Sequence, residues 1–206
     1  MIETQLKARG ISDEHVLAAM ASLPRERFVP DVRRAIAYAD EALPIPAGQT
    51  ISQPWVVARM TELLAPHVGD RVLDVGTGSG YQAAILALLG ARVLSIERQP
   101  ELAESARVRL AELGFADQVE VRLGDGSLGD PTGARWDGII VAAAAPAIPN
   151  PLREQLSSNG GRLVIPVGDR QRQDLLLMVR NGDTWDEKND GAVVFVPLVG
   201  EEGFPG

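Results

Sequence analysis

The sequence contains no cysteine, only two histidines and few aromatic residues, which make up 4% of its 206 residues. The absence of cysteine excludes disulfide bonds, thiol catalysis and cysteine-ligated zinc. His15 and His67 stand in unrelated sequence contexts, so we predict no metal site. Any catalysis must therefore use groups other than thiols and paired imidazoles.

Positive charge is also scarce, with 20 Lys and Arg against 28 Asp and Glu and a net charge of −8. Nucleic-acid binding generally requires basic side chains that neutralise phosphates, so we predict no nucleic-acid partner. No apolar run reaches transmembrane length, and no N-terminal signal peptide is visible. We therefore expect no membrane association and a cytoplasmic location. We also expect a monomer.

The strongest local feature is the stretch Arg71–Gln82. A short apolar strand, Arg71–Val75, is followed by a glycine-rich loop, and residues 83–89 predict a buried helix. The loop consists of Gly76, Thr77, Gly78, Ser79 and Gly80. A strand, a glycine turn and a helix form the first unit of a doubly wound α/β domain. Glycines there allow a sharp turn and close approach to a ligand, and the helix start offers free N–H groups.

The glycine loop could bind either of two cofactors, a dinucleotide such as NAD or S-adenosylmethionine. A dinucleotide fold requires G-x-G-x-x-G, but counting from Gly76 places Tyr81 at the third glycine position. Counting from Gly78 places Ala83 there, and the strand must then run through Gly76. S-adenosylmethionine has no pyrophosphate, and its cationic groups favour a nearby acid such as Asp74. The loop thus favours S-adenosylmethionine over NAD, and a turn without any ligand is the third interpretation.

Acidic residues also follow the next two predicted strands. Glu97 ends one strand about 20 residues beyond the glycine loop, where an acid can bind ribose hydroxyls. Asp125 and Gly126 follow the next strand, where the carboxylate and the N–H could bind an adenine ring. Exposed strand-end acids are the alternative. Because ligands bind beyond the carboxyl ends of such strands, we expect these residues to share one cofactor site.

The alternation of helices and strands predicts one mostly parallel, seven-stranded, doubly wound α/β sheet with helices on both faces. The predicted strands are residues 71–75, 92–96, 119–123, 137–142, 162–167, 174–179 and 193–197. The predicted helices are 13–22, 33–39, 83–89, 100–113, 151–156 and one beginning at about Pro54. We expect a single domain, in which residues 1–53 form an N-terminal cap on a core of residues 54–206.

Residues 43–54 contain three prolines and a glycine, which predicts a long ordered loop without regular structure. Loops of this length are often functional. Ser52, just before Pro54, could serve as the N-cap of the following helix.

Several motifs, in chain order along nearly the whole sequence, resemble those of the protein-L-isoaspartate O-methyltransferase family. They are residues 24–30, 48–54, 76–82, 124–126, 140–144, 166–168 and 195–198. The glycine loop is common to many methyltransferases, whereas Thr50–Pro54 is the specific part. The resemblance implies a Rossmann-like, class I methyltransferase fold and S-adenosylmethionine as cofactor.

The resemblance also implies a repair reaction on damaged proteins and peptides. The α-carboxylate of an L-isoaspartyl residue is methylated, and the ester collapses to a succinimide that partly hydrolyses to aspartate. Ser52 would be the active-site serine. Thr50 and Ile51 would contact the cofactor, and Ser52 would bind substrate together with Gln53, Pro54 and Trp55.

This chemistry suits a chain with few imidazoles and no thiols. A carboxylate with a pKa near about 4 is already anionic at neutral pH, so it needs no general base. The enzyme has to align two reactants in a dry pocket. Three alternatives remain: a methyltransferase for a small metabolite, an NAD-linked dehydrogenase, and a binding protein without catalysis.

Overall fold

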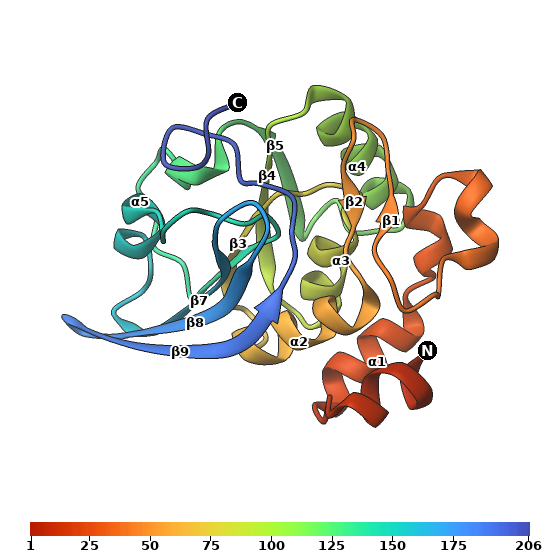
Figure 1. Cartoon of the computed structure of the whole chain (residues 1–206), viewed down its shortest axis with the longest axis horizontal. Helices are drawn as coiled ribbons and strands as arrows, with labels where there is room; N and C mark the ends of the chain where they lie inside the picture. The colour runs from red at the N-terminus through yellow and green to blue at the C-terminus, as the bar shows by residue number, and fades with distance from the viewer.

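The computed structural model describes residues 1–206 and is organised around one seven-stranded sheet in the order β5-β4-β3-β6-β7-β8-β9 (Figure 1). The strands are β3 (Arg71–Val75), β4 (Arg92–Glu97), β5 (Val119–Leu123), β6 (Gly138–Val141), β7 (Asn159–Gly168), β8 (Gln173–Asn181) and β9 (Thr184–Val193). Strands β3 to β7 pair in parallel, whereas β8 and β9 continue the sheet as antiparallel neighbours. The predicted α/β fold class is confirmed.

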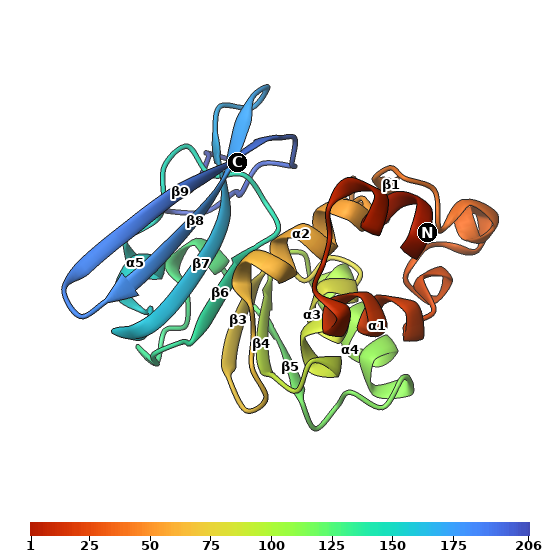
Figure 2. The same ribbon diagram turned by 90° about the horizontal axis from the view of Figure 1, so that it is seen from below.

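Helices lie on both sides of the sheet (Figure 2). Alternate residues of the central strands pack into two different core clusters. Val72 belongs to the larger core cluster, which it shares with helices α1 to α4, and Leu73 belongs to the smaller cluster with α5. The helices are α1 (Glu14–Ser22), α2 (Pro54–Leu64), α3 (Tyr81–Leu88), α4 (Pro100–Glu112) and α5 (Asn150–Glu154). Because both faces are covered, the central strands are apolar on both sides.

The N-terminal segment packs beside α2 and α3 and shares the larger core cluster with them. It contains a π-helical turn, Ile2–Leu6, and helix α1, whose N-cap Asp13 accepts two backbone hydrogen bonds. The expectation of a single domain with an N-terminal cap of residues 1–53 stays a prediction. The apolar cluster that the cap shares with the core favours a single domain.

The last strand differs from the sequence prediction. We expected residues 193–197 in a strand, but β9 spans Thr184–Val193 and the chain beyond it is irregular. The turn at Gly182 joins β8 directly to β9, so the strand begins earlier than its apolar residues suggested. Most of β9 is polar because it is an exposed edge strand.

Two further predictions need correction. The expected irregular segment 43–54 contains a short antiparallel pair, β1 (Leu43–Pro44) with β2 (Thr50–Ile51). The pair closes through a turn in which both Ala47 and Gly48 have positive φ. The helix expected at 33–39 is instead a 3-10 helix, Asp31–Ile36.

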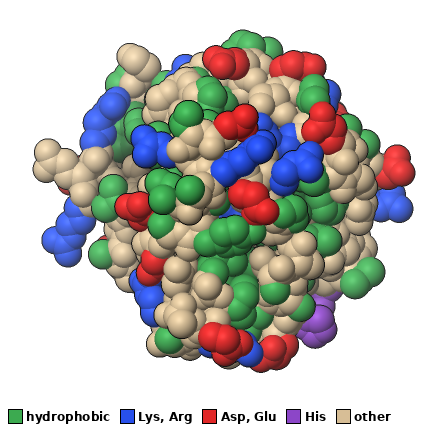
Figure 3. Space-filling view, turned by 90° about the vertical axis from the view of Figure 1, so that its right-hand side faces the viewer, with side chains coloured by type: hydrophobic (Ala, Val, Ile, Leu, Met, Phe, Trp, Pro, Cys, Tyr) green, Lys and Arg blue, Asp and Glu red, His purple; other side chains and the backbone are tan.

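Acidic and basic side chains are interspersed on the face that carries the N-terminal helices (Figure 3). No helix of the structure has both the length and the apolar character needed to cross a membrane.

Candidate active site

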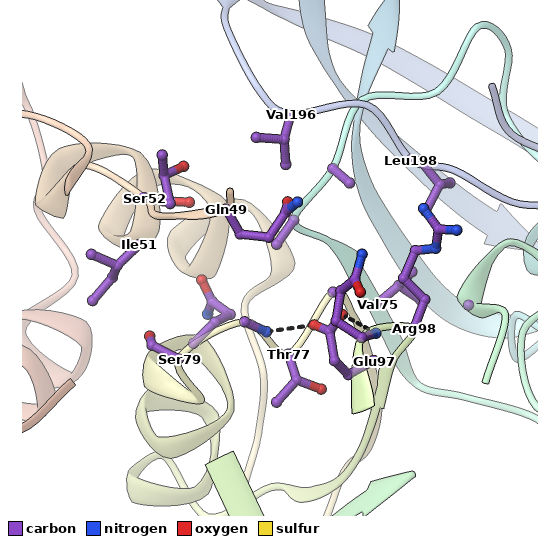
Figure 4. Close-up of a pocket in the computed structure, with 18 of the residues that line it drawn as sticks. Gln49, Ile51, Ser52, Val75, Thr77, Ser79, Glu97, Arg98, Val196 and Leu198 are labelled. Carbon is purple, nitrogen blue, oxygen red and sulfur yellow. Dashed lines mark hydrogen bonds between the residues drawn. The ribbon is translucent and has the colours of Figure 1, made fainter. Parts of the chain in front are cut away.

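The glycine loop forms one wall of an open cavity at the carboxyl ends of β3 and β4 (Figure 4). We call it the glycine-loop cavity. Its wall includes residues 49–52, 75–79, 96–99 and 196–199, together with Gly126. Ser52 and Glu97 lie on opposite sides of it (Figure 4). The cavity therefore has the position that ligand sites take in open α/β sheets.

The backbone of the loop has the conformation that its glycines permit. Gly76, Gly78 and Gly80 all have positive φ, and Gly80 is the N-cap residue of α3. A Cβ on Gly80 would lie 3.3 Å from Leu110 of α4, so glycine also allows close packing there. The loop is thereby held between β3 and the start of a buried helix.

Glu97, the last residue of β4, fixes the shape of the loop. One carboxylate oxygen accepts a hydrogen bond from the Gly78 N–H at 2.8 Å, and the other accepts from the Gln99 N–H at 2.9 Å. The side chain is buried yet lines the cavity. Its oxygens thus present negative charge to a ligand while they anchor two backbone segments.

Asp74 lies beneath the loop and does not line the cavity. It is completely buried, and one of its oxygens accepts a 2.6 Å hydrogen bond from Ser95, whose hydroxyl also contacts Thr77. The other oxygen has no protein partner. Burial raises the pKa of Asp74 to about 7, opposed by the Ser95 hydrogen bond and supported by the charge of Glu97.

Gly126 reaches the cavity wall, but the Asp125 side chain does not. One Asp125 oxygen accepts from the N–H and hydroxyl of Ser127, and the other accepts from the Glu201 N–H. Burial raises the pKa of Asp125, but these hydrogen bonds outweigh it, and the pKa lies below its ordinary value. Asp125 therefore holds the C-terminal segment against the cavity in this structure.

A second open cavity lies between the N-terminal cap and the chain around the end of β9. We call it the cap cavity. Its wall includes Arg9, Gln53, Trp55, Arg172 and residues 192–196. Four residues line both cavities: Thr50, Ser52, Ala142 and Val196. Ser52 therefore lies where the two cavities adjoin.

The interpretation of Ser52 as a helix N-cap is wrong. Gln53 occupies the N-cap position of α2, and no side chain caps this helix. The reason is that Pro54 takes the first helical position, which its fixed φ favours. The Ser52 carbonyl accepts a 2.7 Å hydrogen bond from Arg25, and its hydroxyl makes no hydrogen bond within the protein. The hydroxyl is thus available to a ligand.

Side chains of the cap hold the segment around Ser52 in place. The Gln53 amide donates to the backbone and carboxylate oxygens of Asp40, each at 2.8 Å. Arg9 forms a 3.0 Å ion pair with Asp40, and its guanidinium lies 4.3 Å from the centre of the Trp55 ring. The cap therefore forms one wall of the second cavity and fixes the adjoining loop.

The structure brings most of the predicted site residues to the two cavities. The predicted residues that line the glycine-loop cavity are Thr50, Ile51, Ser52, Gly76, Thr77, Gly78, Glu97 and Gly126. Gln53 and Trp55 line only the cap cavity. Asp74, Gly80, Asp125 and the buried Pro54 line neither cavity.

Sequence reasoning missed several lining residues. They include Gln49, Arg98, Gln99 and residues 196–199 in the first cavity, and Arg9 and residues 192–195 in the second. Residues 195–198 belong to one of the motifs that carried the resemblance. Their motif was therefore a usable signal, although we assigned most of it to a strand.

The fold and the acid-flanked glycine loop define a class I methyltransferase. A solved structure named protein-L-isoaspartate O-methyltransferase superposes with a TM-score of 0.87 at 28% identity, covering 98% of this chain and 67% of that one. A putative protein-L-isoaspartate O-methyltransferase from Plasmodium falciparum, solved with S-adenosyl-L-homocysteine, gives a TM-score of 0.80 at 25% identity, covering 94% of each chain.

Sequence comparison identifies the family. The family described as Protein-L-isoaspartate(D-aspartate) O-methyltransferase matches residues 1–203. A protein-L-isoaspartate O-methyltransferase of Methanoculleus marisnigri is 52% identical over 206 residues, covering 100% of this chain and 93% of that protein. The chain belongs to the protein-L-isoaspartate(D-aspartate) O-methyltransferase family. The predicted methyltransferase activity, its isoaspartyl substrate and S-adenosylmethionine as cofactor are thereby confirmed.

Proposed function

We propose that the glycine-loop cavity binds S-adenosylmethionine, the cap cavity receives the isoaspartyl peptide, and Ser52 orients the substrate carboxylate between them. The single observation that supports this arrangement is that Thr50, Ser52, Ala142 and Val196 line both cavities. A methyl transfer requires two reactants to meet without water between them. Adjoining cavities with a shared wall suit that requirement.

The residues of the glycine-loop cavity fit the cofactor. Glu97 presents a carboxylate that can accept hydrogen bonds from ribose hydroxyls, and it has no paired cation in the structure. A Cβ at position 126 would lie 2.5 Å from a side-chain carbon of Val75, so any larger residue there would force the cavity wall to shift. We propose that Thr77 and the Gly126 backbone complete the contacts. Asp74 and Asp125 would support the site from behind its wall.

The bound cofactor supplies an electrophilic methyl group on a cationic sulfonium. The chain's own residues then have to hold an anionic carboxylate without protonating it. The free Ser52 hydroxyl can donate a hydrogen bond to that carboxylate, and α2 begins two residues later with no side-chain cap. Its first N–H groups and partial positive charge favour an anion at this end. No general base is needed, because the carboxylate is already ionised.

Gln53, Pro54 and Trp55 take complementary roles in the proposal. Gln53 and Trp55 form the cap-cavity wall beside Ser52, where residues flanking the isoaspartate would lie. Pro54 contributes by setting the start of α2. Because an isoaspartyl residue differs from aspartate in its backbone path, this wall would discriminate between them by shape.

The first test is thermal unfolding with candidate cofactors. A ligand that binds the native state raises the melting temperature when its concentration is well above Kd. We expect S-adenosylmethionine and S-adenosylhomocysteine to do so, and NAD and NADP not to. Stabilisation by NAD alone would contradict the proposed cofactor site.

The second test compares two peptides that differ only in one L-isoaspartyl or L-aspartyl residue. We expect methyl transfer to the isoaspartyl peptide only. Ser52→Ala should lower kcat/KM at least about tenfold, which corresponds to about 1.4 kcal/mol. Because the Ser52 hydroxyl makes no hydrogen bond within the protein, the melting temperature of Ser52→Ala should stay close to that of the unmodified chain. Full activity of Ser52→Ala would remove Ser52 from the mechanism.

We also propose that the chain acts as a monomer in the cytoplasm. In support of the monomer, residues of one chain form both cavities. Light scattering at working concentration would reveal a dimer if this is wrong.

A further inference from the structure

Arg25 is a completely buried cation close to the proposed reaction site. It lies in the N-terminal cap, 27 residues before Ser52, and no carboxylate forms a salt bridge with it. Its Nε donates to the Ala37 carbonyl at 2.8 Å, and one Nη donates to the Ser52 carbonyl at 2.7 Å. Its second Nη has no hydrogen-bond partner in the protein.

This arrangement is unfavourable for stability alone. A buried charge is normally paired, and an apolar side chain of similar volume often stabilises a protein interior more. Burial lowers the pKa of Arg25 from its ordinary value, in agreement with poor solvation. Folding stability alone therefore does not explain a guanidinium at this position. The contacts of Arg25 suggest a role in function.

Those contacts link Ser52 to α3, the helix that follows the glycine loop. The guanidinium lies 4.9 Å from the centre of the Tyr81 ring, and Tyr81 begins α3 and lines the glycine-loop cavity. The same guanidinium donates a hydrogen bond from one Nη to the Ser52 carbonyl. The chain has no cis peptide bonds, so the N–H of Gln53 points away from Arg25 in the planar peptide. Arg25 thus fixes the orientation of the peptide that follows Ser52.

We propose that Arg25 is a positioning residue for methyl transfer, which fixes the Ser52 peptide against α3 so that the hydroxyl faces the substrate carboxylate. The inference rests on the proposed role of Ser52. Arg25, a residue of the N-terminal cap, would thereby help to align the substrate with the cofactor. Tyr81 contributes the aromatic face on which the guanidinium rests.

The test is a double-mutant cycle on the full chain with Arg25→Met, Ser52→Ala and the double variant. We expect Arg25→Met to lower kcat/KM for the isoaspartyl peptide about tenfold. In the Ser52→Ala background, the same change should cost less than about twofold, because Arg25 acts through Ser52. The Kd for S-adenosylhomocysteine should change less than about threefold in Arg25→Met.

Arg162→Met is the matched control. Arg162 also donates to a main-chain carbonyl, that of Leu63, but it lies in β7 and lines neither cavity. We expect this variant to keep its kcat/KM. Arg25→Lys retains the positive charge and an N–H donor group, although without the planar guanidinium, so it should recover part of the activity. If Arg25→Met does not fold, the cycle is carried out with Arg25→Lys.

The outcomes separate the two proposals. If the losses from Arg25 and Ser52 multiply in the double variant, Arg25 does not act through Ser52 and this inference is overturned. It is also overturned if Arg162→Met lowers kcat/KM as much as Arg25→Met. If Ser52→Ala alone keeps full activity, the proposed role of Ser52 fails, and the inference fails with it.

Discussion

The glycine-loop cavity and the cap cavity share residues, but their walls come from different kinds of structure. The first is built mainly from the ends of buried parallel strands and the loops that directly follow them. The second is built from the N-terminal cap, the segment around Ser52 and the chain after an exposed edge strand. Side-chain bonds over long sequence separations hold these pieces together.

The difference indicates how binding is divided in this molecule. A wall formed by strand ends gives a cofactor a preformed site, because the sheet fixes the backbone. A wall formed by tethered segments depends on each tether, and three of them involve charged groups: Arg9 with Asp40, Arg59 with Asp190, and Arg25 with Ser52. Substitutions in the glycine-loop cavity should therefore change the affinity for the cofactor. Substitutions in the cap cavity should change the KM for the peptide.

The largest expected effect concerns Glu97. Glu97→Ala removes the acceptor for two backbone N–H groups as well as the proposed ribose contact. We expect the Kd for S-adenosylhomocysteine to rise about 100-fold, as for the loss of more than one charged hydrogen bond. Calorimetric titration provides the measurement, with Glu101→Ala on the exposed start of α4 as the control. Equal affinities in both variants would contradict the assigned position of the cofactor.

The second effect concerns the tether between α2 and β9. Arg59 forms two hydrogen bonds with Asp190, at 2.7 and 2.5 Å, and one with Glu62 at 2.7 Å. Arg59→Met leaves two partly buried acids unpaired, so we expect a loss of about 2 kcal/mol in the free energy of unfolding. Urea denaturation measures it. The surface pair of Arg107 and Glu104 is the control, and Arg107→Met should change stability by less than about 0.5 kcal/mol.

The third effect would sharpen the comparison, because it concerns the cap cavity alone. Asp40→Ala removes the carboxylate that joins Arg9 to Gln53. We expect KM for the isoaspartyl peptide to rise about fivefold, a loss of about 1 kcal/mol, with no change in cofactor affinity. Glu41→Ala, at the exposed neighbouring position, should leave both constants unchanged. A change in cofactor affinity without a change in KM would show that the cavities are not separable.

The last effect is a dependence of stability on pH. The pKa of Asp74 rises from 3.8 to about 7 on folding, so the native state binds this proton more tightly than the unfolded chain. Ionisation of Asp74 therefore lowers the free energy of unfolding as pH rises through this interval. Asp74→Asn lacks that loss, and its melting temperature relative to the unmodified chain should rise between about pH 4 and pH 7. The exposed Asp186→Asn should show no such trend.

The same contrast explains which parts of the fold could be predicted from sequence. Strand β3 matched its predicted bounds because its buried residues form a short run that ends at Gly76. The half-exposed strand β5 matched because its residues alternate between buried and exposed up to Gly124. Strand β9 was misplaced because its exposed residues are mostly polar and its apolar residues come after its end. An exposed strand with few apolar residues lacks the apolar–polar alternation from which strands are predicted.

The site shows the same division. The glycine loop, Glu97 and Gly126 could be assigned from their places after apolar strands. Arg25 could not be assigned in this way, because arginine is rarely fully buried and its contacts lie 12 and 27 residues away. The capping interpretation of Ser52 failed although the sequence contained the decisive residue, Pro54, which favours the first position of a helix.

The tether between Arg59 and Asp190 has a consequence for the order of folding. It joins residues 131 positions apart, whereas β3 and β4 are connected through one helix. Closing so large a loop costs more chain entropy than forming neighbouring strand–helix units. We therefore expect β3, α3 and β4 to assemble early and the cap cavity to close late. During refolding, the ability to bind S-adenosylhomocysteine should then return before the ability to methylate a peptide.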